Sequence, residues 1–257
     1  MNVGAGQEAS RHVLSELGFE TRGVGEDLHG SAAITPEMHV PDVGWLRTSI
    51  LAVWADTLIG LLAARVTAPR VPVTLELDVQ LYRPAPAAGI VRGIARTRKA
   101  GRSVFVAGVE FTSDGGEPLA IANGSFMLAP DPELKLPPTL SIDLPAQSRR
   151  LDRPFAERVG CVRRGPGVAV LPRSEDGLNA SRTVNGGLIA LAAEEAALSL
   201  APGATLCSLG LRYLQPARTG PVVADARARD GLGQVELRDH GNGDRLVALA
   251  TTRTFGT

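Results

Sequence analysis

The sequence predicts an α+β fold of two tandem units, each an antiparallel sheet wrapped around a long buried helix. Three observations predict this architecture: a repeat across the two halves of the chain, one apolar helical segment in each half, and paired alternating strands after each helix. The 257 residues are 44% hydrophobic and 21% charged, a composition able to bury one large core or two small ones.

The repeat is clearest where a strand-like segment ends in proline and alanine. Leu77–Ala85 and Leu209–Ala217 share this form, and their prolines, Pro84 and Pro216, lie 132 positions apart. Each segment continues through a glycine into another β-rich segment. We therefore expect the two halves to repeat one arrangement of elements.

A long apolar helix precedes that strand in each half, over Ser49–Ala64 and Gly187–Leu200. Both are apolar almost all round, which is typical of buried helices. Ile50–Ala64 is interrupted by Asp56 and is too short to span a bilayer. The first residues lack the charged and apolar regions of a signal peptide. We therefore expect a soluble, cytoplasmic protein.

Each unit is also predicted to end in two strands joined by a glycine-rich turn, an arrangement typical of hairpins. The strands and turns are Ser103–Phe111, Asp114–Glu117 and Leu119–Met127, then Gln234–Arg238, Gly241–Asp244 and Leu246–Phe255. Six prolines between Pro130 and Pro154 favour an extended connector. The predicted boundaries are a first unit at 1–128, a connector at 129–154 and a second unit at 155–257. A further helix is possible at Glu8–Leu17.

Composition argues against several classes of function. Lysine plus arginine and aspartate plus glutamate each number 27, so the chain lacks the basic excess of nucleic-acid and membrane-surface binders. Cys161 and Cys207 form no CxxC pair, and no histidine has metal-ligand spacing, so we expect neither disulfide nor metal. Only two of the basic residues are lysines, a usage typical of GC-rich bacterial genes.

A motif spans the start of the second apolar helix. Asn179 is followed after five residues by Asn185-Gly186-Gly187 and, after six more, by Glu194. This pattern resembles the hot-dog acyl-CoA thioesterases of the phenylacetyl-CoA thioesterase type, whose motif is Asn, five residues, His-Gly-Gly, six residues and a catalytic carboxylate. The resemblance covers nearly the whole chain as a double hot-dog. Asn185 departs from it, because the family has histidine there.

The first half departs further from the family pattern. Asp56 stands at the carboxylate position, but Arg47-Thr48-Ser49 replaces His-Gly-Gly. Thr74, ten residues before Pro84, matches a family hydroxyl whose counterpart in the second half is the apolar Leu206.

The resemblance implies that each active site combines the turn of one unit with the carboxylate and hydroxyl of the other. One site would then be nearly complete, and its twin, made from Arg47, Thr48, Ser49, Glu194 and Leu206, would have lost function. The nearly complete site combines Asn179, Asn185, Gly186 and Gly187 with Asp56 and Thr74.

The roles that this implies follow from the chemistry of the residues. The N–H of Gly187 at a helix start would face the thioester oxygen, supported by the amide of Asn179 or Asn185. Asp56 would act as general base on water or as nucleophile, with a pKa raised by burial. Thr74 would orient the water or the carboxylate.

The remaining candidates have competing interpretations. Glu194 is either a second catalytic base or an ion-pair partner of Arg47, which would otherwise help to bind substrate. Asn185 and Gly186 would bind substrate, or simply form an ordinary turn before a helix. Glu195 is expected to be solvated or capping.

The predicted function is therefore hydrolysis of acyl-CoA thioesters, with CoA as part of the substrate and no other cofactor, in a homodimer of double hot-dog chains. Two alternatives remain: a non-catalytic acyl-CoA or lipid-binding module, and another acyl-thioester reaction such as acyl transfer or dehydration. The sequence does not indicate the length of the acyl chain, or whether the thioester is formed with CoA or with acyl-carrier protein.

Overall fold

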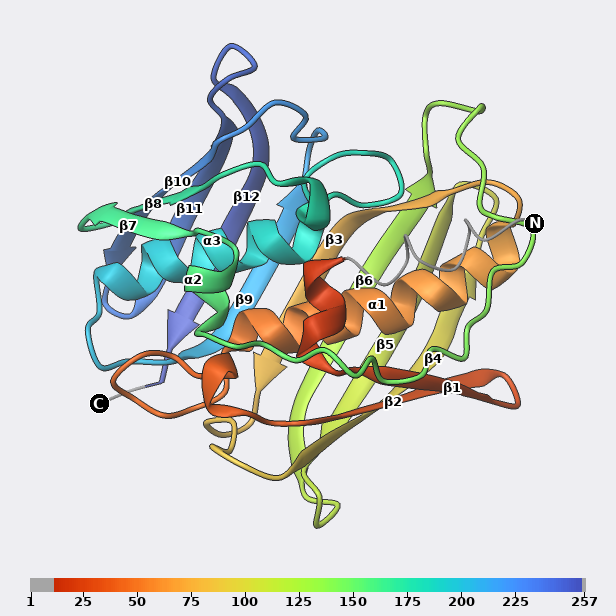
Figure 1. Ribbon diagram of the computed structural model, residues 1–257, viewed down its shortest axis with the longest axis horizontal. Helices are drawn as coiled ribbons and strands as arrows, with labels where there is room; N and C mark the ends of the chain where they lie inside the picture. Colours follow the sequence, from red (N-terminus) through yellow and green to blue (C-terminus); the bar gives the residue numbers. More distant parts are fainter. Residues whose placement is uncertain (1–11, 256–257) are drawn as a thin grey trace.

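A computed structural model describes residues 12–255, which form one continuous antiparallel sheet with two long helices across one face (Figure 1). The first half contributes α1 (Thr48–Thr67) and the strands β1 (Glu20–Val24), β2 (Asp27–Ala33), β3 (Pro72–Leu81), β4 (Ile90–Ala100), β5 (Val104–Thr112) and β6 (Pro118–Leu128). The second contributes α3 (Gly186–Ser199) and the strands β7 (Val162–Gly165), β8 (Val168–Leu171), β9 (Leu206–Tyr213), β10 (Val222–Arg229), β11 (Leu232–Asp239) and β12 (Arg245–Thr254). The short helices are η2 (Val13–Leu17), η3 (Pro36–Met38), α2 (Phe155–Arg158) and η4 (Glu175–Gly177).

The strand order is symmetric about its centre. It runs β1-β2-β4-β5-β6-β3-β9-β12-β11-β10-β8-β7, so that β3 pairs with β9 in the middle. In that pairing Asp78 lies opposite Gly210, and Leu77 lies opposite Leu211. Positions 78 and 210 are 132 apart, the repeat spacing, so a pseudo-twofold axis passes between them. The predicted fold class, a double hot-dog, is confirmed, while the predicted unit boundaries remain a prediction.

The two helices run antiparallel, with the N-terminal half of each beside the other (Figure 1). Most residues of both are buried, on the faces toward the sheet and toward each other. The predicted segment Ile50–Ala64 extends at both ends into α1, whose 20 residues are long and apolar enough, by length and composition alone, to cross a membrane. Its burial beneath the sheet and against α3 is that of a core helix.

The N-terminal segment and the connector pack over the first half. The ring of Phe19 stacks on Trp54 of α1, with ring centroids 5.3 Å apart. Thr21 of β1 forms a β-bridge with Leu144 of the connector, and Arg70 forms another with Lys135. The rest of the connector consists of turns, bends and irregular chain, so the prediction that it is extended holds only in part. Of the possible helix at Glu8–Leu17, only Val13–Leu17 is seen as a helix, and residues 8–11 lie outside the described part.

Candidate active site

Asp56 and Thr74, predicted to act together, are hydrogen bonded. The Thr74 hydroxyl on β3 donates to Asp56 Oδ1 of α1 at 2.8 Å, and both residues are part-buried. Burial raises the pKa of Asp56 to about 6, although the Thr74 hydroxyl acts in the opposite direction by stabilising the carboxylate. Asp56 is therefore a carboxylate that can exchange a proton near neutral pH.

The predicted Asn-Gly-Gly turn forms the N-terminus of α3, close to the helix that carries Asp56. Asn185 is the N-cap, and its Oδ1 accepts the Gly187 N–H at 2.8 Å. A Cβ on Gly187 would lie only 2.5 Å from Val53 Cγ2, so glycine allows α3 to begin against α1 one turn before Asp56. The prediction that the Gly187 N–H faces a thioester oxygen is wrong here, because the Asn185 side chain occupies it.

Tyr213 on β9, which the sequence did not single out, joins the turn to Asp56. Its hydroxyl donates to the Gly186 carbonyl at 2.9 Å. Burial raises the pKa of Tyr213 well above its usual value, and the nearby Asp56 carboxylate raises it further. The repeat could have revealed this residue, because position 213 corresponds to Leu81 in the first half. The site that contains Asp56 and Thr74 thus has a tyrosine at the position where its twin has a leucine.

The side chain of Asn179 stabilises the loop before α3. Its Oδ1 accepts from the Ser181 N–H at 2.9 Å and from the Thr183 N–H and hydroxyl, both at 3.1 Å. This arrangement is an Asx-type loop, which explains an asparagine at this position through local geometry. The amide oxygen is fully used there, so only the side-chain NH2 of Asn179 remains available to a substrate.

Glu194 meets the N-terminus of α1 at the twin site. Its carboxylate accepts from the backbone N–H groups of Thr48 at 2.9 Å and Ser49 at 3.2 Å, from the Ser49 hydroxyl at 2.6 Å, and from Arg47 Nη1 at 3.2 Å. Glu194 is completely buried. Of the two interpretations, the ion pair is confirmed, and the carboxylate is closed to any substrate.

Arg47 is likewise unable to bind substrate, contrary to its predicted role. Its side chain is completely buried, and Nη1 lies 2.6 Å from Glu195 Oε1 in addition to its contact with Glu194. Burial works against the charge, but the two carboxylates outweigh it and raise the pKa of Arg47. Glu195 also pairs with Arg163 at 2.7 Å, so the prediction of a solvated Glu195 was wrong. The cluster contains two arginines, Arg47 and Arg163, and two glutamates, Glu194 and Glu195, so its formal charges cancel.

The twin site shows how a carboxylate in the middle of one helix can meet the N-terminus of the other. Asp56 and Glu194 are each the ninth residue of their helix, and each helix begins beside the middle of the other. In the twin, the longer glutamate reaches the first N–H groups of α1. Asp56 is one methylene shorter and is bound to Thr74, and the equivalent Gly186 N–H donates no hydrogen bond within residues 12–255. Asp56, Thr74, Asn185 and Gly186 also retain solvent exposure. One site is open, and the other is filled by its own carboxylate.

Within residues 12–255, no three histidine, cysteine, aspartate or glutamate side chains are grouped so that they could hold a metal ion. The polar groups of the open site are the Asp56 carboxylate, two hydroxyls, and the amides at the start of α3.

Comparisons with known proteins identify similar folds. Residues 48–120, from the start of α1 into β6, match the thioesterase superfamily. An acyl-ACP thioesterase from Bacteroides thetaiotaomicron superposes with a TM-score of 0.62 at 14% identity, covering 90% of this chain and 98% of that one. The 12:0-ACP thioesterase from Umbellularia californica superposes with a TM-score of 0.61 at 12% identity, covering 92% of this chain and 100% of that one. A protein from Novosphingobium aromaticivorans with a provisional thioesterase name superposes with a TM-score of 0.60 at 17% identity, covering 92% of this chain and 98% of that one. No curated protein matches the chain.

The closed twin site generates a prediction about stability. Glu194→Gln should lower the free energy of unfolding by about 3–5 kcal/mol, because Glu195 alone then faces both Arg47 and Arg163, which leaves one buried positive charge uncompensated. Chemical denaturation measures this loss. Glu175→Gln is the control, since Glu175 pairs with Arg173 and Arg182 while it is 68% exposed, and its loss should be below about 1 kcal/mol. A Glu194→Gln protein as stable as the control would contradict the buried pair.

Proposed function

We infer that this chain, whose residues 48–120 match the thioesterase superfamily and whose fold is that of hot-dog thioesterases, hydrolyses acyl thioesters at the open site. One observation carries the proposal: Asp56, with a pKa of about 6, lies on α1 beside the N-terminus of α3. A base and a free backbone N–H therefore lie on neighbouring helices, both on partly exposed residues.

The reaction follows from these two groups. The Asp56 carboxylate takes a proton from a water molecule, and the water oxygen bonds to the thioester carbonyl carbon. The negative charge that develops on the carbonyl oxygen is stabilised at the start of α3. The C–S bond then breaks, the carboxylic acid is released, and the departing sulfur takes up the proton. Thr74 keeps the Asp56 carboxylate in place throughout.

The Gly186 N–H is the donor that we assign to the carbonyl oxygen. Gly187 is capped by Asn185, whereas the Gly186 N–H has no partner in the described part of the chain. The twin site supports this choice, because Thr48, the equivalent of Gly186, donates the shorter of the two backbone hydrogen bonds to Glu194. Tyr213 holds the Gly186 peptide through its carbonyl.

An apolar cavity beside Thr74 suits an acyl chain. It has a volume of about 210 Å³ and lies between the last turn of α1, the start of β3 and the β5–β6 strands. Phe126 of β6 forms one wall, and it pairs directly with Thr74 across the strands. Its ring also lies 3.4 Å from the position of a Cβ on Gly60, one turn beyond Asp56. Phe126 therefore lies both in the wall of the cavity and against the turn of α1 that follows Asp56.

The first experiment measures thiol release from acyl-CoA and acyl-ACP substrates of short, medium and long chain. Asp56→Asn should lower kcat by about 100-fold or more, because it keeps the shape and removes the base. Asp225→Asn is the control, since Asp225 is exposed on β10, far in the fold from α1. Equal turnover by wild type and Asp56→Asn would overturn the assignment. Comparing CoA with ACP thioesters decides the carrier.

A second function, binding of acyl thioesters without turnover, is favoured by one observation. The Asn185 side chain occupies the Gly187 N–H, which leaves a single free backbone donor at the turn. Calorimetric titration with acyl-CoA separates the two functions. Binding by wild type with no thiol release would make the protein a binding module.

Activity should depend on pH through Asp56. The base works as carboxylate, so kcat/KM should rise with pH through about 6 and level off above it. Thr74→Val removes a hydrogen bond that favours the charged form, which raises the pKa of Asp56 and moves this rise to higher pH by about 1–2 units. The pH–rate profile of Thr112→Val, a substitution on β5, should match the wild type. An unmoved profile for Thr74→Val would contradict the coupling.

Phe126 should limit the length of the acyl chain. Phe126→Leu removes part of the cavity wall that lies against the turn of α1 after Asp56, and it should shift the preference of kcat/KM toward longer chains. Phe111→Leu is the matched control, because Phe111 is an equally buried aromatic that packs on Gly93 and does not line the cavity. A preference that stays the same in Phe126→Leu, or moves equally in both variants, would place the acyl chain elsewhere.

A further inference from the structure

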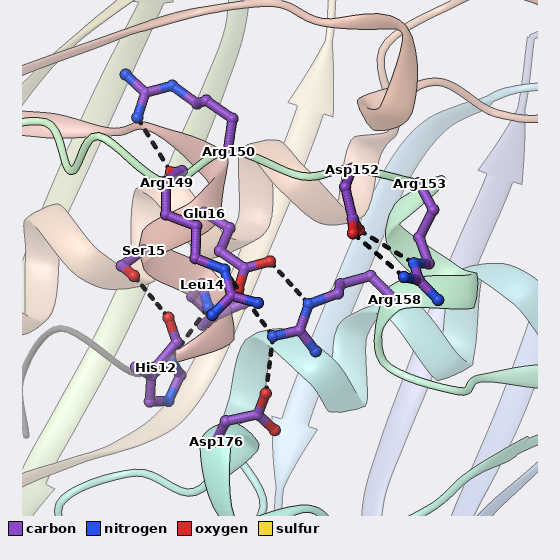
Figure 2. A network of polar contacts seen from close by, with 10 residues as sticks. All are labelled: His12, Leu14, Ser15, Glu16, Arg149, Arg150, Asp152, Arg153, Arg158 and Asp176. Carbon is purple, nitrogen blue, oxygen red and sulfur yellow. Dashed lines mark hydrogen bonds and ion pairs between the residues drawn. The ribbon is translucent and has the colours of Figure 1, made fainter.

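We propose that Arg158 is a positioning residue, which locks the N-terminal segment onto the loop that presents the Asn185–Gly187 turn. The proposal rests on the proposed function, since that turn supplies the backbone donor for the reaction. Arg158 lies at the end of α2, and the network around it is distant in sequence from both halves of the site (Figure 2).

The centre of the network is a buried carboxylate. Glu16 of η2 has only 3% of its side chain exposed, and Arg158 binds both of its oxygens, from Nε at 2.8 Å and from Nη2 at 2.7 Å. Arg149 of the connector adds a contact of 2.9 Å. A bidentate pair of this kind fixes orientation as well as distance. The N-terminal segment is therefore anchored to α2 at a defined angle.

The same guanidinium holds the loop before α3. Arg158 Nη2 also donates to Asp176 Oδ2 of η4 at 2.8 Å, so that one side chain spans two carboxylates (Figure 2). These carboxylates belong to segments 160 positions apart, near the N-terminus and in the second unit. The two segments also pack against each other, and within residues 12–255 this guanidinium links their carboxylates by ion pairs.

Asp176 is one residue from the contact that sets the turn. The Gly177 carbonyl accepts the Asn185 N–H at 3.0 Å, and a Cβ on Gly177 would lie 2.7 Å from Leu188 Cδ1 of α3. The η4 turn therefore lies directly against the first turn of α3. A shift of η4 moves Asn185 and the Gly186 N–H with it, and misplacement of about 1 Å can cost a reaction about 100-fold.

The test compares Arg158→Leu with Arg153→Leu. Arg153 lies five positions earlier and is 57% exposed, and in the part of the chain that the structure describes it pairs only with its neighbour Asp152, so it is a matched control (Figure 2). Arg158→Leu should lower kcat about 10-fold or more while KM stays within about twofold, and the rise in rate near pH 6 should not move, because Asp56 is untouched. Arg153→Leu should behave as wild type.

Hydrogen exchange provides a readout that needs no turnover. Amides of residues 177–187 should exchange faster in Arg158→Leu than in wild type or Arg153→Leu, while β5 and β6 stay protected. This contrast supports the proposal even if the wild type releases no thiol, an outcome that would overturn the proposed function alone. The positioning role would be overturned if residues 177–187 of Arg158→Leu exchange as slowly as in wild type. It would also be overturned if Arg158→Leu has a lower melting temperature but an unchanged kcat.

If Arg158→Leu does not fold, Arg158→Lys replaces it. Lysine keeps the charge but cannot bind both Glu16 oxygens and Asp176 with one planar group. It should therefore lie between wild type and the expected leucine result in both kcat and exchange. A lysine variant identical to wild type in both would show that the planar fork has no positioning role.

Discussion

The pairing of β3 with β9 governs the arrangement of everything functional in this molecule. Because the strands meet antiparallel about an axis between Asp78 and Gly210, the two units share one sheet, and their helices lie antiparallel on one face. Each helix then begins beside the middle of the other. Free N–H groups and the positive end of the helix dipole come to face a side chain from the partner helix. A carboxylate at that position therefore lies beside the start of the other helix in both halves.

The two halves use this arrangement in opposite ways. A buried charge is costly unless it is paired and hydrogen bonded. Glu194 satisfies that requirement with four donors, and the cluster around it is closed and balanced in charge. Among the described residues, Asp56 has one donor, Thr74, and it keeps an elevated pKa with some solvent exposure. The incompletely satisfied carboxylate is the one to which we assign the reaction, because perturbed pKa values are common at functional sites.

The sequence predicted the features that depend on spacing. The repeat, the two helices and the turns follow from residue order, because periodicity reports which face is buried. The convergence of Asp56 with Thr74 was implied by the resemblance to hot-dog thioesterases. The partners of buried polar groups were harder to predict. Glu195 in an ion-pair cluster, Asn185 on the Gly187 N–H and Tyr213 on the Gly186 carbonyl depend on side-chain conformations across units. A pattern of residue types contains no information about those conformations.

The closed twin site also constrains the open one. A buried ion pair contributes little net stability compared with a well-packed apolar core, but breaking it is costly. Glu194 therefore disfavours any sliding of α3 along α1, since a shift would separate it from Thr48, Ser49 and Arg47 together. Because the helices are rigid and related by the pseudo-twofold axis, fixing one contact fixes the distance between Asp56 and the start of α3. The closed twin site thus keeps the spacing between the two helices on which the open site depends.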